Sequence, residues 1–370
     1  MKITKIKLIN FRNYSKLQLK LDNHLNIFVG NNAQGKTNIL ESIYVLALTK
    51  SHRVGIENNL IKLDESKSII SGSVKKNNII NDLRIELLPD NKKVFFNETE
   101  IRKLSNYIGN LNVIMFCPDD LDLLKKAPSI RRNYLNIELS QLDTNYIKYL
   151  NEYNKLLKTK NEYLKSININ DSKEDLYLDT INSELIERAC KIFESRTKYI
   201  ELINSKINYI YNKITKLDNL KITYDYGLEL NSLDVSNYKE VLSSKIKSNT
   251  RREILQGMSL YGPHRDDFSF ELDNIDLKFY GSQGQQRIAV IAFKLAEIEI
   301  FKEIKDDEPV LLLDDIFSEI DIRKRNQLLK YIDDNVQTII TTTDLKNINK
   351  KTVEKSKVFE VHDGNVLERS

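Results

Sequence analysis

The segment GNNAQGKT, residues 30–37, has two glycines, a lysine and a threonine in the spacing G-x-x-x-x-G-K-[ST]. An apolar stretch precedes it and a helical pattern follows, so its backbone N–H groups can surround a phosphate at a helix N-terminus. We expect Lys36 to reach the β- and γ-phosphates and the Thr37 hydroxyl to ligate Mg²⁺. The sequence therefore predicts an ATP or GTP site with these contacts: Gly30, Asn31, Asn32, Ala33, Gln34, Gly35, Lys36 and Thr37.

A second stretch, VLLLDD at 310–315, carries the acidic groups that such a site needs. Four apolar residues predict a buried strand, and Asp314 stands at its carboxyl end. We expect Asp314 to hold Mg²⁺ and Asp315 to act as the general base that orients water. The alternative, two solvated acids at a strand end, is disfavoured by the phosphate-binding loop.

The third candidate is GSQGQQR, residues 281–287, which precedes a strongly apolar helical stretch. Ser282, Gln283 and Gly284 would place a hydroxyl and backbone amides at a helix N-terminus, which is an anion site. One triphosphate does not need two such sites in one chain. We therefore expect this segment to contact the γ-phosphate held by a second copy, in a homodimer formed with ATP.

The elements that must position these residues are widely separated. Lys36 and Asp314 are 278 positions apart, so a large insertion interrupts the nucleotide fold. Alternating and apolar stretches predict strands before about 117, helical spacing dominates from about 128 to 217, and strands return near 310 and 338. We predict an α/β head made of 1–126 and 258–370, with a mainly helical arm at 127–257. Helices packed on the main core remain the alternative to a projecting arm.

Composition adds weaker constraints. The net charge of +4 is small, but residues 1–56 are locally basic. Arg53 and the lysine pairs of the expected hairpin turns are candidate DNA phosphate contacts, although paired lysines on turns more often serve solubility: Lys75, Lys76, Lys92 and Lys93. The two cysteines lack ligand spacing, and no apolar run reaches the length of a membrane span or a signal peptide. We expect a cytoplasmic protein with no membrane partner.

In this order the motifs resemble the ABC-type ATPases of the SMC group, and within it a family of bacterial DNA-repair proteins. The resemblance covers nearly the whole chain, and further stretches carry it: KLINFRNY (7–14), FCPDDLDLLKKAPSIRRNYLN (116–136) and YGPHRDD (261–267). It implies an ABC-type P-loop ATPase head with an inserted α-helical arm.

The resemblance also implies residue roles. Ser282 would be the signature serine, and Asp315 the base where many relatives have Glu. Residues 318–321 would form the D-loop, and Arg12 and Asn13 would lie near the base or ribose. His264 and Arg265 would lie at the edge of the site or serve the structure. No Gln follows the 112–116 strand and no switch His follows 338–342, so slow hydrolysis is expected.

The implied function is an ATP-dependent dimer that grips duplex DNA or a single-strand/duplex junction. It would act with RecR and RecO to load RecA at gaps, as a weak DNA-stimulated ATPase, with roles in replication-fork maintenance and SOS induction. The alternative is the nucleotide-binding subunit of an ABC transporter. That class predicts a shorter insertion, a Q-loop and a switch histidine. This chain has a long insertion and neither the Q-loop glutamine nor the switch histidine at the expected positions.

Overall fold

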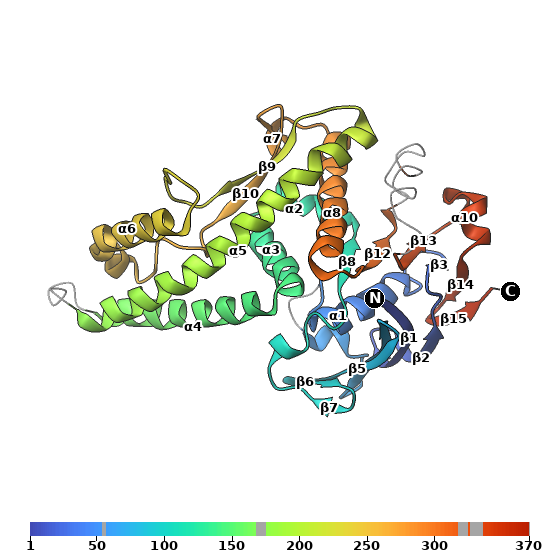
Figure 1. Cartoon of the computed structure of the whole chain (residues 1–370). Helices are drawn as coiled ribbons and strands as arrows, with labels where there is room; N and C mark the ends of the chain where they lie inside the picture. Colours follow the sequence, from blue (N-terminus) through green and yellow to red (C-terminus); the bar gives the residue numbers. More distant parts are fainter. Residues whose placement is uncertain (54–56, 168–174, 317–324, 326–335, 370) are drawn as a thin grey trace. The chain divides into compact units, whose positions relative to one another are not determined.

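A computed structural model describes residues 1–53, 57–167, 175–316, 325 and 336–369. The chain divides into two compact units. Figure 1 labels the helices and strands. The first comprises Met1–Leu121, Lys213–Thr215 and Val290–Ser370, and the second comprises Asp122–Asn212 and Lys216–Ala289. Residues 258–289 thus fall in the second unit. The boundaries expected from the sequence, 126/127 and 257/258, remain a prediction.

An antiparallel sheet forms one side of the first unit. Along the sheet its order is β2 (Tyr14–Lys20), β1 (Lys2–Phe11), β4 (Ser68–Lys76), β5 (Ile79–Leu88), β6 (Asn91–Phe96) and β7 (Thr99–Glu100). Apolar residues alternate along β1, β2, β4 and β5, so one face is buried and the other faces solvent.

The second sheet of this unit positions the predicted nucleotide residues. Its order is β15 (Asn365–Glu368), β14 (Lys357–His362), β3 (Leu25–Val29), β13 (Thr338–Thr342), β12 (Val310–Asp314) and β8 (Val113–Phe116). All neighbours pair in parallel except β14 and β15. Because parallel strands end at one edge of a sheet, the segments after β3, β13, β12 and β8 meet there.

Helix α1 (Lys36–Leu48) begins within the phosphate-binding loop and contacts strands of both sheets. Most of its residues are buried, and from Ile43 to Leu48 its sequence is apolar except for the Tyr44 hydroxyl. The remaining short elements of the unit are η1 (Glu57–Leu60), η2 (Leu104–Asn106), η3 (Pro118–Leu121), η6 (Leu345–Asn347) and α10 (Lys350–Glu354). The phosphate-binding loop therefore leads into a helix that is buried along most of its length.

The second unit is mainly helical, with one small sheet. Its elements are α2 (Asp122–Lys125), α3 (Pro128–Leu142), α4 (Thr144–Ser166), α5 (Leu176–Thr215), α6 (Val235–Gln256), α7 (Leu277–Tyr280), β9 (Leu220–Asp225), β10 (Asp267–Leu272), β11 (Ile275–Asp276) and the start of α8 (Gln283–Lys305). The sequence pattern predicts helical structure from about 128 to 217 without a break near 143. The structure ends α3 at Leu142, because Asp143 has extended backbone and caps α4 by accepting from the Asn145 N–H.

A buried polar network organises the second unit around Arg196 of α5. Its guanidinium donates to Asp266 Oδ2 at 2.7 Å, to Pro263 O at 2.8 Å and to the Tyr224 and Tyr146 hydroxyls. Both Arg196 and Asp266 are almost fully buried. Removing either partner would leave an unpaired buried charge, so this part of YGPHRDD serves the structure.

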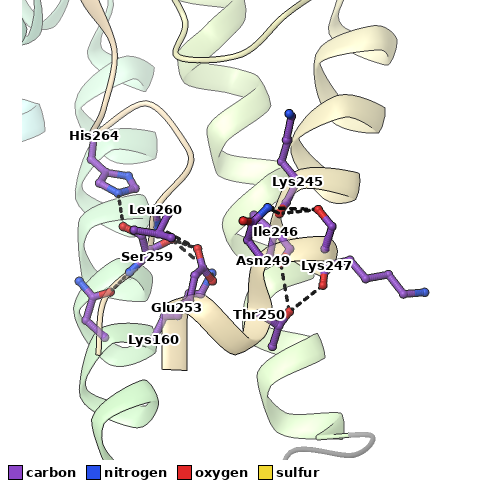
Figure 2. A network of polar contacts seen from close by, with 12 residues as sticks. Lys160, Lys245, Ile246, Lys247, Asn249, Thr250, Glu253, Ser259, Leu260 and His264 are labelled. Atoms are coloured by element: carbon purple, nitrogen blue, oxygen red, sulfur yellow. Dashed lines mark hydrogen bonds and ion pairs between the residues drawn. The ribbon is translucent and has the colours of Figure 1, made fainter. Parts of the chain in front are cut away.

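A second buried ion pair joins α4 to α6 (Figure 2). Lys160 Nζ lies 2.7 Å from Glu253 Oε2, and neither side chain reaches solvent. Ser259 donates to Glu253 Oε1, and its carbonyl accepts from His264 Nε2 at 3.2 Å. Arg265 donates to the same carbonyl. His264 and Arg265 therefore hold the loop after α6, which supports the structural reading of these two residues.

Within the described part of the chain, no helix is both long and apolar enough to cross a membrane.

Candidate nucleotide-binding site

The phosphate-binding loop leaves β3 and turns sharply into α1. Gly35 has φ +109°, a conformation that costs other residues free energy. A Cβ there would lie 2.6 Å from Asn13 Nδ2 and 2.7 Å from the Tyr14 hydroxyl, which donates to Gly35 O at 3.0 Å. Only glycine fits, because the β1–β2 turn packs directly on the loop.

Lys36 is folded onto the loop that precedes it. Its Nζ donates to Gly30 O and to Asn31 O, both at 2.7 Å. Burial lowers the pKa of Lys36, while nearby Asp315 and Asp314 oppose that shift. The ammonium group is therefore held at the loop that would surround a phosphate, within the electrostatic reach of both acids.

Asp314 stands at the end of β12 and accepts two hydroxyl hydrogen bonds on Oδ1. Thr37 Oγ1 of α1 donates at 2.9 Å and Thr341 Oγ1 of β13 donates at 2.6 Å. Burial raises the pKa of Asp314, although both hydrogen bonds oppose the shift. A cation would compensate for this buried carboxylate.

Asp315 follows directly on a left-handed backbone, with φ +46°. Its N–H donates to Thr341 Oγ1 at 3.1 Å, which fixes the turn after β12. Asp314 and Asp315 line the same cavity.

The cavity has a volume of about 310 Å³, and its lining residues are Asn32, Ala33, Gly35, Lys36, Thr37, Asn38, Arg53, Pro118, Asp314, Asp315 and Thr341. A second hollow of about 760 Å³ shares Asn38 and Arg53 with it and is also lined by Arg12, Asn13 and Ile61. Arg53, a candidate DNA contact by sequence, is thus placed beside the P-loop, where its charge opposes the rise in the pKa of Asp314 that burial causes.

Arg12 and Asn13 connect the N-terminal sheet to this site. The Arg12 guanidinium donates to both carboxylate oxygens of Glu41, at 2.9 Å and 2.8 Å. Burial would raise the Glu41 pKa, but the hydrogen bonds from Arg12 and Ser51 hold it below its usual value. Asn13 accepts from Asn38 Nδ2 at 2.8 Å. Both residues line the second hollow, but Arg12 also anchors α1.

The GSQGQQR segment forms a capping box at the start of α8, in the second unit. Ser282 Oγ accepts from the Gln285 N–H at 3.3 Å, and Gln285 Oε1 accepts from the Ser282 N–H at 2.9 Å. Ser282, Gln283 and Gly284 are exposed. The helix N-terminus is therefore ordered by its own side chains and open to an external anion.

The two glycines of this segment differ in what surrounds them. A Cβ on Gly281 would lie 2.7 Å from Leu277 O, so packing against α7 requires glycine there. A Cβ on Gly284 would meet no described atom within 4 Å. Glycine in a helix is unfavourable relative to alanine, so nothing in the described chain accounts for Gly284. Close approach by another molecule would account for it.

The order of the parallel strands, the loop between β3 and α1, and the acid on β12 define a P-loop nucleotide-binding head. The model of the RecF/RecN/SMC N-terminal domain matches residues 2–366. The chain is 40% identical over 367 residues to the DNA replication and repair protein RecF of Bacillus cereus strain B4264 and of Bacillus thuringiensis strain Al Hakam, covering 98% of each chain. This chain belongs to the RecF family of DNA replication and repair proteins.

Solved structures agree with this assignment. Two structures of the recombination mediator RecF in the RecFOR pathway, one described with ATP, are 29% identical, with TM-scores of 0.91 and 0.90, covering 100% of this chain and 98% of theirs. An SMC head bound to the C-terminal winged-helix domain of ScpA shares the fold, at 15% identity and a TM-score of 0.55 over 100% of this chain and 98% of that one. The resemblance to the SMC group and the predicted fold class are confirmed.

The four lysines that the sequence suggested as DNA contacts have different surroundings in the structure. Lys92 Nζ donates to Thr49 O at 2.7 Å and so caps the C-terminus of α1. Lys76 lies 3.6 Å from Asp307, and Lys93 is paired in register with Glu86. Only Lys75 stands opposite another lysine, Lys2. DNA contact by any of them remains a prediction.

Sequence reasoning missed Thr341, whose hydroxyl contacts both Asp314 and Asp315. The threonine-rich strand TIITT was visible, but its place between β3 and β12 was not. Residues 318–321, the expected D-loop, lie outside the described residues.

Proposed function

We propose that this chain binds ATP with Mg²⁺ in the first-unit cavity and uses it to form a homodimer that holds DNA. The observation that carries the proposal is the joining of Lys36, Thr37 and Asp314 within one polar cavity. Lys36 would exchange the Gly30 and Asn31 carbonyls for the β- and γ-phosphates. Asn31, Asn32, Ala33 and Gln34 would present the loop backbone.

Thr37 and Asp314 fit Mg²⁺ by the chemistry of their donors. Mg²⁺ prefers oxygen ligands and usually takes one or two from the protein and the rest from water and phosphate. Among the described residues, no group of three or more His, Cys, Asp or Glu side chains could hold a metal. We therefore propose that the metal is bound together with the triphosphate. Its charge there would compensate for the burial of Asp314.

Asp315 would hold and orient the attacking water as general base. The same RecF relatives support ATP as the ligand, since one of their structures is described with ATP. With no switch histidine after β13, we propose that hydrolysis is slow and resets the dimer. The chain would then be a weak, DNA-stimulated ATPase.

Ser282, Gln283 and Gly284 would bind the γ-phosphate held by a second copy. Their exposed helix N-terminus and the unexplained glycine support this role. By analogy with the RecF relatives of the RecFOR pathway, the dimer would act on duplex DNA or single-strand/duplex junctions. It would act with RecR and RecO to load RecA, with roles at replication forks and in SOS induction.

The test is the oligomeric state and DNA affinity of the chain with ATP, ADP or no nucleotide. We expect a dimer and tighter DNA binding only with ATP, most clearly in the Asp315→Asn variant. Ser282→Arg should bind ATP normally and remain a monomer, because the larger side chain blocks the helix N-terminus. A monomer under every condition, or a dimer in Ser282→Arg, would contradict the proposal.

A further inference from the structure

Three neighbouring strands of the N-terminal sheet contain no acidic residue. Strands β2, β1 and β4 read YSKLQLK, KITKIKLINF and SIISGSVKK, with seven lysines among them. The whole chain carries 53 acidic residues in 370, so this segregation of charge is local. Across these three strands the charged side chains have one sign, and the next strand, β5, ends this region by placing Asp82 opposite Ser73.

The strand register gathers these lysines on one face. Lys5 stands directly opposite Lys20, and Lys2 directly opposite Lys75. Lys7 is paired with Gln18, and Lys16 with Ile9, on the same side. We call this set of six the basic outer face: Lys2, Lys5, Lys7, Lys16, Lys20 and Lys75.

Like charges directly opposite each other on a sheet destabilise it. Two such pairs occur here, and within the described ranges no ion pair joins any of the six lysines to an acid. Other lysines of the same sheet do have partners, since Lys67 pairs with Glu86 and Lys76 with Asp307. The basic outer face thus keeps an unfavourable arrangement that an external polyanion would relieve.

The face is also physically open. Lys16 and Lys20 are exposed, and the other four are half-buried, as expected for lysines whose stems cover apolar surface while the charged ends reach water. On the side of β4 the outward positions next to Lys5 and Lys7 are Ser73 and Ser71, which are short. These short side chains leave Lys5 and Lys7 accessible from the β4 side in the part of the sheet that the structure describes.

We propose that the basic outer face is the surface on which the first unit binds the phosphate backbone of duplex DNA. This proposal rests on the DNA-binding role proposed above and replaces the dispersed lysine candidates with one continuous surface. Lys16 and Lys20 are about 14 Å apart along β2, which matches about four base pairs of axial rise. The outward positions of β1, β2 and β4 carry no aromatic side chain, so single-strand stacking is absent there.

The experiment measures binding to a 30-base-pair duplex by fluorescence anisotropy across a salt series, with ATP present. The test variant is Lys5→Gln, Lys7→Gln, Lys16→Gln and Lys20→Gln together. The matched control makes the same change of net charge on exposed lysines of the second unit: Lys148→Gln, Lys155→Gln, Lys198→Gln and Lys239→Gln. ATP affinity and the circular dichroism spectrum verify that both variants fold.

We expect the test variant to bind duplex at least tenfold more weakly at low salt. The slope of log K against log salt should fall by about 3 to 4, because each lost phosphate contact removes about 0.9. The control variant should keep most of the duplex affinity and most of the salt dependence. Equal losses in the two variants, an unchanged slope in the test variant, or an equal loss of single-strand binding would overturn the proposal. If the unsubstituted chain binds no duplex, the proposed function itself fails.

Discussion

Thr37 and Asp314 are 277 positions apart in the chain and are joined by a hydrogen bond of 2.9 Å. The contact unites the first turn of α1 with the end of β12. Thr341, on the strand that separates β12 from β3, donates to the same oxygen of Asp314. The Asp314 carboxylate therefore joins α1, β12 and β13 by hydrogen bonds, and it is also the proposed metal ligand.

Asp314→Asn should abolish the Mg²⁺ dependence of ATP binding while preserving the fold. The amide retains the shape of the side chain but removes the charge that Mg²⁺ requires. Isothermal titration with ATP in Mg²⁺ and in EDTA would give similar affinities in this variant. Thr341→Val, which removes the hydrogen bond to Asp314 and the acceptor of the Asp315 N–H, should weaken metal affinity by about 10- to 100-fold. A full Mg²⁺ response in Asp314→Asn would remove this residue from the metal site.

Gly284→Ala should stabilise α8 and weaken the ATP-dependent dimer. The added methyl group meets no described atom within 4 Å, and alanine is favoured over glycine in a helix by up to about 1 kcal/mol. Urea unfolding and sedimentation with ATP measure the two effects. Gly281→Ala is the contrasting variant, since its Cβ would clash with Leu277 O and lower stability. An unchanged dimer in Gly284→Ala would show that no partner approaches this position closely.

Lys20→Glu should raise stability and lower DNA affinity together. It converts the like-charge pair with Lys5 into an opposite-charge pair, which contributes about 0.2–1 kcal/mol. The same change removes one phosphate contact and adds repulsion. Gln18→Glu, opposite Lys7, should act in the same direction without removing a lysine. Urea unfolding measures the stability of both variants and fluorescence anisotropy measures their DNA affinity. A loss of stability in Lys20→Glu would contradict the repulsion ascribed to the lysine pairs.

Acidification should destabilise the chain through His264. Burial lowers the pKa of His264 to about 4, from 6.5 in an unfolded chain. The unfolded state therefore binds more protons between these values, and stability is lost as the pH falls from about 6.5 toward 4. The difference between pH 8 and pH 5 amounts to about 2 kcal/mol for this group.

Urea unfolding of His264→Gln should show a correspondingly flatter pH dependence. His362→Gln, at an exposed position, is the control for the loss of one imidazole. His52 is also buried with a pKa lowered to about 4, so part of the dependence should persist in His264→Gln. Identical profiles for the unsubstituted chain and His264→Gln would refute the assignment.

Local chemistry was readable from the sequence because its determinants are adjacent in the chain. The P-loop needs consecutive N–H groups, glycines and one lysine. The capping box of Ser282 and Gln285 spans four residues, and apolar runs before Gly30 and Asp314 identify buried strands. Such features depend on backbone conformation and local periodicity, which the residue types themselves specify. The nucleotide fold and its large insertion followed from these motifs and their spacing.

Roles that depend on pairing between distant segments were decided only by the tertiary structure. Thr341 gains its role because β13 lies between β3 and β12. Lys92 caps α1 because β6 places it beside Thr49, whereas Lys5 faces Lys20 because of the β1–β2 register. These lysines cannot be distinguished from the local sequence, because the residues next to a lysine in the chain do not specify which residue lies opposite it in the sheet. Strand order and register decide which residue lies opposite each lysine. They therefore decide whether a lysine caps a helix, as Lys92 does, or faces another lysine, as Lys5 does.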